Sequence, residues 1–171
     1  MKRAIHLYPD FSNEPAIQGF REKNDPLAAK IRPHITLVFP FDDPMPDESL
    51  IHWVHQVAYE HRPITASFSA PIHHMDVQVW LKVIKGCEDI TALHKALYAG
   101  HLQSYLRTNS RYTPHVTLGT GLSGIEKLHE ALTVNRFESK QFHLDRIIIE
   151  TIRDTDQASI LLKTVPLNRS A

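Results

Sequence analysis

Two copies of one short motif constrain the fold of this chain more than any other feature. Residues 33–37 read Pro-His-Ile-Thr-Leu, and residues 114–118, about 80 positions later, read Pro-His-Val-Thr-Leu. Proline is tolerated at the first residue of a strand, so each copy predicts the start of a strand. Side chains alternate along a strand, which places the histidine and threonine of each copy on one face and the aliphatic residues on the other.

The elements predicted around each copy occur in the same order. Hydrophobic periodicity predicts helix, strand, helix, strand and strand in the first half of the chain, and the same series in the second. The predicted helices are 12–23, 47–61, 88–106 and 123–134, and the predicted strands are 2–8, 34–39, 64–72, 77–84, 115–119, 137–143, 146–152 and 159–165. A repeat of this length predicts two similar units packed into one body.

The residue types in the motif suit proton transfer on a phosphate ester. If a pseudo-twofold axis relates the halves, His34 and His115 meet across a cleft together with Thr36 and Thr117. One imidazole can take a proton from the attacking water or hydroxyl while the other gives one to the leaving oxygen, so we expect the two rings within about 5 to 8 Å of each other. An unperturbed histidine pKa of about 6.5 makes both protonation states accessible at pH 7. The threonine hydroxyls can donate hydrogen bonds to phosphate oxygens.

The charge balance limits the partners of such a site. Lysine and arginine number 19, as do aspartate and glutamate, so the formal net charge is zero. A protein that coats long nucleic acid usually has a basic excess, so no DNA partner is expected. Local cations could still attract a phosphate, and Lys30, Arg32, Arg107 and Arg111 lie in the loops before the two motifs. Each of the four is equally well explained as solvated surface.

The paired motif and the order of elements resemble the two-histidine (2H) phosphoesterase superfamily, which includes bacterial RNA 2′,3′-cyclic phosphodiesterases, also named 2′-5′ RNA ligases. The resemblance covers nearly the whole chain. It implies a single bilobal α+β domain over residues 1–171, with repeat halves of about 1–86 and 87–171. Each lobe would have an antiparallel sheet with helices on its outer face, and a cleft would lie between the lobes.

The same resemblance implies roles for the motif residues. His34 and His115 would be the catalytic acid and base, and Thr36 and Thr117 would bind the substrate phosphate. No metal or other cofactor would be required.

Five further residues could line the cleft or contact substrate. His6 and Tyr8 share the polar parity of the first strand, and Tyr8 could stack on an unpaired base or lie on the surface. Trp80 lies opposite the apolar face of its strand, where it could stack on a base, close the cleft wall or simply be half-buried packing. Arg32 and Arg111 are the loop cations placed nearest the two motifs.

The chain has 12 histidines, which raises the question of a metal site. His52 and His55 lie three apart on a predicted helix, while His73 and His74 are adjacent and would point to opposite faces of a strand. No His-Glu-x-x-His or Cys-x-x-Cys pattern accompanies them, so no metal is predicted.

The remaining features bear on location. The single cysteine, Cys87, excludes an internal disulfide framework and fits a reducing compartment. The sequence has neither an apolar run long enough to span a membrane nor a stretch of secretory length near its start, which predicts a cytoplasmic protein. We also expect a monomer that does not bind membranes.

These observations predict a metal-independent phosphodiesterase. The resemblance implies that its substrate would be a 2′,3′-cyclic phosphate or a 2′-5′ phosphodiester of a nucleotide or RNA end, in the direction of either hydrolysis or joining. Two alternatives remain at this point: a non-catalytic module that binds nucleotides or RNA ends on the same fold, and a scaffold whose His-x-Thr pairs are vestigial. The intact state of both histidines and both threonines favours catalysis.

Overall fold

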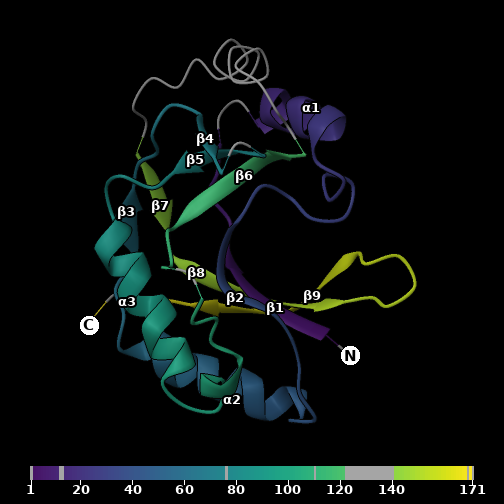
Figure 1. Cartoon of the computed structure of the whole chain (residues 1–171). Helices are drawn as coiled ribbons and strands as arrows, with labels where there is room; N and C mark the ends of the chain where they lie inside the picture. Colours follow the sequence, from purple (N-terminus) through teal and green to yellow (C-terminus); the bar gives the residue numbers. More distant parts are fainter. Residues whose placement is uncertain are drawn as a thin grey trace.

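The computed structural model describes residues 2–11, 14–75, 77–109, 111–121, 141–168 and 170. The described elements follow the chain in this order (Figure 1): β1 (Lys2–Leu7), α1 (Glu14–Asn24), β2 (Ile35–Asp42), α2 (Asp47–Tyr59), β3 (Ile64–Ala66), β4 (Ile72–His74), β5 (Gln78–Lys82), α3 (Cys87–Tyr98), a 3-10 turn η1 (Gln103–Tyr105), β6 (His115–Thr120), β7 (Phe142–Leu144), β8 (Arg146–Ile152) and β9 (Ser159–Pro166). No helix in these described ranges is long and apolar enough to cross a membrane.

The strands form one large antiparallel sheet and one small pair. The large sheet has the order β4-β5-β6-β2-β1-β8-β9, and β3 pairs with β7. The α+β class with antiparallel pairing is therefore confirmed. The two motif strands, β2 and β6, are neighbours in this sheet and are joined through the pairing of Ile35 with Val116.

The sheet differs from the expected arrangement in how the two halves of the sequence contribute to it. Strand β6, from the second half, pairs with β5 from the first, and β8, from the second half, pairs with β1 from the first. The halves thus exchange strands and do not build one sheet each. An unpaired strand edge is satisfied by any strand of suitable register, whichever half of the chain supplies it.

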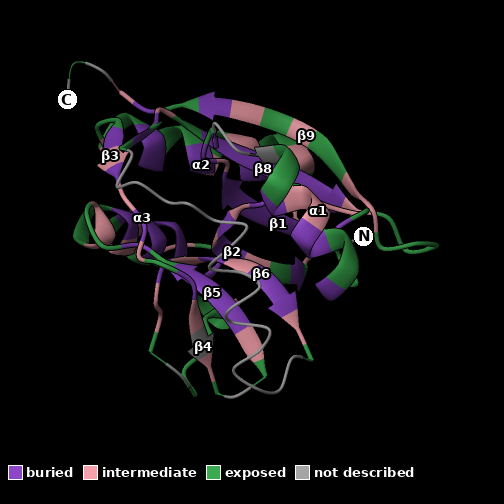
Figure 2. Cartoon of the chain, turned by 90° about the horizontal axis from the view of Figure 1, so that it is seen from above, coloured by how far each residue is buried: buried purple, intermediate pink, exposed green. Residues whose placement is uncertain are grey.

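One face of the large sheet is covered by α2 and α3. Leu50 and Val54 of α2 and Leu93 of α3 are fully buried in the same core cluster as Leu37 and Leu118 of the motif strands. The two helices contact each other, whereas α1 lies against β6, apart from them (Figure 1). Buried positions are concentrated in the central strands, while the edge strand β9 consists of intermediate and exposed positions apart from buried Val165 (Figure 2). The aliphatic residues of each motif therefore hold its strand in the core, and the polar residues face the other way.

Several predicted elements have different bounds in the structure. The predicted helix over 88–106 ends at Tyr98 and continues after a turn as η1. Gly100 is required in this turn because a Cβ there would lie 2.7 Å from the indole ring of Trp53. The predicted strand over 64–72 is divided into β3, which pairs with β7, and β4, which pairs with β5. The predicted helix at 123–134 lies outside the described residues, as does most of the predicted strand at 137–143.

Candidate active site

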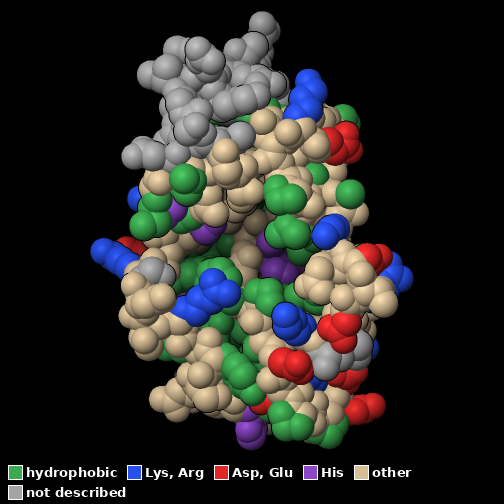
Figure 3. Space-filling model, turned by 45° about the vertical axis from the view of Figure 1, so that its right-hand side comes forward, with side chains coloured by type: hydrophobic (Ala, Val, Ile, Leu, Met, Phe, Trp, Pro, Cys, Tyr) green, Lys and Arg blue, Asp and Glu red, His purple; other side chains and the backbone are tan. Residues whose placement is uncertain are grey.

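The four polar motif side chains share one face of the β2–β6 pair. In the antiparallel register of Ile35 with Val116, His34 lies across from Thr117, and Thr36 lies across from His115. The alternation is as predicted: the aliphatic motif residues are fully buried, and the two histidines and two threonines are half-buried. On the face drawn in Figure 3, histidine side chains lie in a hollow with lysine and arginine side chains at its rim.

Both motif histidines are oriented by the same kind of hydrogen bond to the backbone. Nδ1 of His34 lies 2.7 Å from the carbonyl oxygen of Arg32, and Nδ1 of His115 lies 2.7 Å from that of Thr113. Because a carbonyl oxygen only accepts hydrogen bonds, Nδ1 carries the proton in each ring. Nε2 is then the proton-accepting atom of both neutral imidazoles, which is the state that a general base requires.

Partial removal from water keeps both rings neutral. Burial lowers the pKa of His34 from 6.5 to about 4, an effect to which the positive charges of Arg21 and of protonated His115 add and which the Arg32 carbonyl and Asp25 oppose. Burial likewise lowers the pKa of His115 from 6.5 to about 4, assisted by His74 and opposed by the Thr113 carbonyl. The expectation of an unperturbed pKa near 6.5 is therefore wrong for the substrate-free protein, because it took no account of dehydration.

His34 is bordered by ionisable side chains on the neighbouring strands. The His6 ring meets the His34 ring edge-on, with centroids 4.4 Å apart, and is itself buried. Nε2 of His6 lies 3.7 Å from Oε2 of Glu150 on β8, and the Tyr8 hydroxyl donates a hydrogen bond of 2.7 Å to Oε1 of the same carboxylate. The guanidinium of Arg32 lies 5.4 Å from the centre of the Tyr8 ring. The structure thus brings His6, Tyr8 and Arg32 to the His34 side of the site.

His115 is bordered by stacked rings. The Trp80 ring lies parallel to it, with centroids 3.5 Å apart and planes 14° apart, and His74 stacks on Trp80 with the same distance and angle. The Trp80 indole N–H donates to Oε1 of Gln78 at 2.9 Å. With a histidine ring on each side, neither face of the indole is open to a nucleotide base in this structure. Trp80 here is packing for His115.

The loop cations differ in their surroundings. Arg32 and Arg111 are exposed and Lys30 is half-buried, whereas the Arg107 guanidinium lies 4.1 Å from the centre of the Phe39 ring. Arg111 lies on the loop immediately before His115.

Two residues near the site, Glu150 and Arg21, were not singled out from the sequence, and a third, His74, was considered only as a metal ligand. Glu150 follows three consecutive isoleucines in a strand, and a lone carboxylate in such a run is a signal because buried carboxylates need partners. Buried Arg21 pairs with Asp25 at 2.8 Å and donates a hydrogen bond of 2.9 Å to the Ile31 carbonyl, which fixes the loop that leads to His34. The position of His74 beside Trp80 follows from the register of the β4–β5 pair, in which His74 pairs with Gln78 and Ile72 with Trp80.

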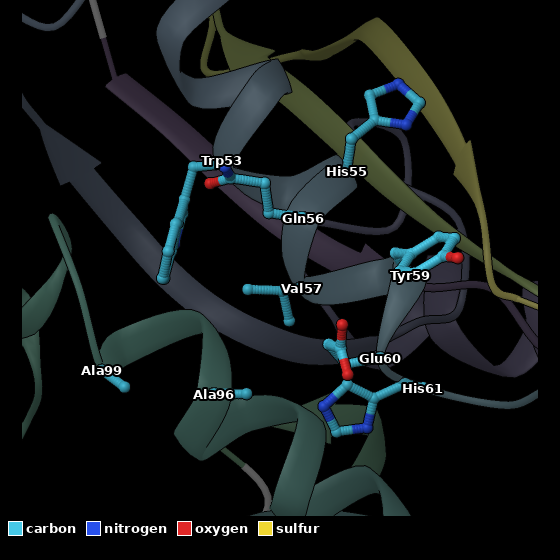
Figure 4. A pocket seen from close by; sticks show the side chains of 9 residues that line it. All are labelled: Trp53, His55, Gln56, Val57, Tyr59, Glu60, His61, Ala96 and Ala99. Carbon is cyan, nitrogen blue, oxygen red and sulfur yellow. The ribbon is translucent and has the colours of Figure 1, made fainter. Parts of the chain in front are cut away.

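Other concave or titratable regions of the molecule are separate from this site. A groove of 720 Å³ lies between α2 and α3, where Trp53, Tyr59, His61 and Ala96 contribute to its lining (Figure 4). These helices cover the apolar face of the sheet, opposite the motif side chains. Within the part of the chain that the structure describes, no three histidine, cysteine, aspartate or glutamate side chains are grouped as metal ligands.

Comparison with known proteins is consistent with this geometry. A model of the 2′-5′ RNA ligase superfamily matches residues 9–156, a range that contains both motif copies. The chain belongs to that superfamily. The resemblance inferred from the motifs is thus confirmed.

Relatives within the superfamily carry a general functional name. A Bacillus thuringiensis (strain Al Hakam) protein named "Putative phosphoesterase" is 30% identical over 155 residues, which cover 86% of this chain and 84% of that protein. A Bacillus anthracis (strain A0248) protein of the same name matches with the same identity and coverage. Superfamily membership and these names support an enzyme of the phosphoesterase type.

Solved structures support the fold. The Thermus thermophilus protein TT0787 superposes with a TM-score of 0.68 at 13% identity, covering 100% of both chains. Escherichia coli LigT in complex with 3′-AMP superposes with a TM-score of 0.65 at 17% identity, covering 97% of both chains. At these identities the likeness concerns the architecture of the superfamily alone.

Proposed function

We propose that this chain is a metal-independent phosphodiesterase that acts on a 2′,3′-cyclic phosphate or a 2′-5′ phosphodiester of a nucleotide or RNA end. One observation carries the proposal: two histidines, each held through Nδ1 by a carbonyl two residues earlier, lie on one sheet face with two threonine hydroxyls. The functional unit is a monomer of the whole domain, residues 1–171, because each half supplies one histidine and one threonine.

In the hydrolytic direction the two imidazoles do different work. Nε2 of His115 accepts a proton from the attacking water, and Nε2 of His34 gives a proton to the leaving 2′-oxygen. Thr36 and Thr117 donate hydrogen bonds to the non-bridging phosphate oxygens, where negative charge increases as water adds. In the joining direction the same two groups exchange roles.

The reaction needs one neutral and one protonated histidine, whereas burial by itself favours two neutral ones. An anionic phosphate beside the rings raises the pKa of both, because a nearby negative charge favours the imidazolium form. Substrate binding is therefore coupled to the uptake of one proton from solvent, which the acid then donates. This coupling discriminates in favour of ligands that carry negative charge at the reacting centre.

The neighbouring structures support a nucleotide substrate. Escherichia coli LigT has been crystallised with 3′-AMP and with ATP, both of which carry phosphate on a nucleoside. The balanced charge of this chain fits a small phosphate ester or the end of an RNA better than a long duplex, so no DNA partner is proposed.

The test is turnover of a 2′,3′-cyclic nucleotide and of a short RNA with a 2′,3′-cyclic phosphate end, measured for wild type, His34→Ala and His115→Ala. His52→Ala, which removes an exposed histidine on α2, is the matched control. Loss of turnover in both site variants and its retention in the control supports the proposal. If all variants bind nucleotide and none, including wild type, turns it over, the proposal fails and the binding module takes its place.

A further inference from the structure

Behind His34, the chain buries two ionisable side chains that the proposed reaction does not use. His6 is 3% exposed and Glu150 is 7% exposed. They come from adjacent strands, β1 and β8, and their side chains meet with Nε2 of His6 3.7 Å from Oε2 of Glu150. Burying a carboxylate costs free energy of folding unless other groups compensate its charge, so the burial of this pair needs an explanation.

Two atoms of the pair have no hydrogen-bond partner among the described residues: Nδ1 of His6 and Oε2 of Glu150. The other carboxylate oxygen is satisfied, since it accepts the Tyr8 hydroxyl at 2.7 Å. A neutral imidazole has one N–H and one lone pair. With the N–H on Nε2, directed at Oε2 of Glu150, the lone pair remains on Nδ1 as a buried acceptor in the ring that meets His34.

The neighbours of His34 act on its charge in opposite directions. Arg21 on α1 and protonated His115 on β6 disfavour a positive charge on it, whereas Asp25, which follows α1, favours one. His6 on β1 and Tyr8, which follows β1, lie beside the ring, with Arg32 near the Tyr8 ring and Glu150 in contact with both His6 and Tyr8. The Glu150 carboxylate is thus a second negative group in this surrounding that can stabilise a proton on His34.

We propose that Glu150 and His6 form a carboxylate–imidazole pair that orients His34 and favours its protonated form during the reaction. The inference rests on the proposed function in one respect: that reaction is what uses the proton on His34. Glu150 acts on the His6 ring by charge, across the 3.7 Å between Oε2 and Nε2, and the Nδ1 lone pair of His6 lies in the ring that meets His34. Both are positioning residues, because they act on substrate through His34 and do not touch it.

The test measures the protonation of His34 in the substrate-free protein. The pKa of the His34 ring, followed by NMR titration, should fall in Glu150→Gln, which keeps the shape of the side chain and removes its charge. It should also fall in His6→Phe, which keeps a ring and removes both nitrogens. Thr151→Val is the matched control, because Thr151 is buried at the next position of β8, on the opposite face of the strand.

Kinetics give a second measurement. In Glu150→Gln, kcat should fall on the order of tenfold with little change in KM, less than the 10²- to 10⁴-fold expected for a catalytic acid or base. One limb of the pH profile of kcat, the limb that reports His34, should move to lower pH while the other stays in place. A purely structural role would lower the melting temperature and leave both limbs unmoved.

The two proposals can fail separately. If wild type has no phosphodiesterase activity but the His34 pKa falls in both variants, the proposed function fails and the pairing stands. If the His34 pKa and both kinetic limbs in Glu150→Gln and His6→Phe equal those of wild type, the pairing is overturned even in an active enzyme. If one variant does not fold, the other decides.

Discussion

The two halves of the site are built alike at the motif and differently around it. In both, a carbonyl two residues earlier holds Nδ1 of the histidine at 2.7 Å. The neighbouring strand places His6 beside Thr36 on one side and Trp80 beside Thr117 on the other, in equivalent registers. His6 is ionisable and lies beside the buried carboxylate of Glu150, whereas Trp80 is stacked between the imidazoles of His74 and His115.

This difference in surroundings shows how one repeated motif can serve two proton-transfer roles. The repeat sets where the imidazoles lie and which nitrogen is free. The side chains on β1 and β5 then determine how readily each ring accepts a proton. A carboxylate behind one ring and an aromatic face on the other stabilise the imidazolium by different means, so separate substitutions can alter the two rings independently.

The largest expected effect is the loss of either imidazole. His34→Ala and His115→Ala should each lower kcat by about 10²- to 10⁴-fold, because each removes one proton transfer. The double variant should be only slightly slower than the slower single one, since groups that act as a unit are not additive. Steady-state turnover of a cyclic-phosphate-ended RNA measures this. Wild-type turnover in either single variant would contradict the equivalence of the two half-sites.

The next effect concerns pH. Burial lowers the pKa of both His34 and His115 to about 4, so the free protein reaches the state with one proton only in the acid range. A bound phosphate should raise these values by about 1 to 3 pH units. The bell in kcat/KM, which reports the free protein, should therefore lie at lower pH than the bell in kcat, which reports the complex. Coincident bells would show that bound substrate does not raise the pKa of either histidine.

Removal of a phosphate ligand should have a smaller effect. Thr36→Val and Thr117→Val each remove one donor to a charged oxygen, which is worth about 1.5 to 3 kcal/mol, or roughly ten- to a hundredfold in kcat/KM. Serine at either position keeps the hydroxyl and should retain most activity. Similar losses at both positions indicate that the phosphate is held symmetrically, whereas a loss at only one locates it in that half-site.

The surroundings of His115, where Trp80 stacks, can be altered separately from those of His34. Trp80→Leu removes a ring face from His115, and because an aromatic face favours a cation by about 0.5 to 2 kcal/mol, kcat should change by roughly two- to thirtyfold. The NMR-measured pKa of His115 should fall, while that of His34 stays unchanged. A shift of both values would show that the two half-sites are not independent.

The smallest expected effect is that of a chelator. If the imidazoles make the proton transfers and the hydroxyls hold the phosphate, no metal is needed, and EDTA should leave turnover unchanged. The measurement compares rates with and without EDTA, and then after adding a divalent ion. Loss of activity that the ion restores would assign the chemistry to a metal.

The fold and the candidate site were predictable where the signal was local. The alternation in residues 33–37 and 114–118 predicts that the aliphatic residues lie in the core, and Leu37 and Leu118 are indeed fully buried. Helix α2 was predictable because its apolar residues recur at helical spacing. The division of the predicted strand at 64–72 into two pieces was not, since β3 pairs with β7 from a distant part of the chain, whereas β4 pairs with β5, which follows it directly.

The sequence by itself determined which residue types meet at the site, since a strand alternates its side chains and two copies of one motif imply two equivalent strands. Only the tertiary structure decided what surrounds them. The pairing of β8 with β1 brings Glu150 to His6, and that of β5 with β6 brings Trp80 to His115. It also removes the imidazoles from water and thereby lowers their pKa. Register and burial arise from contacts between residues far apart in the chain, so no local pattern contains them.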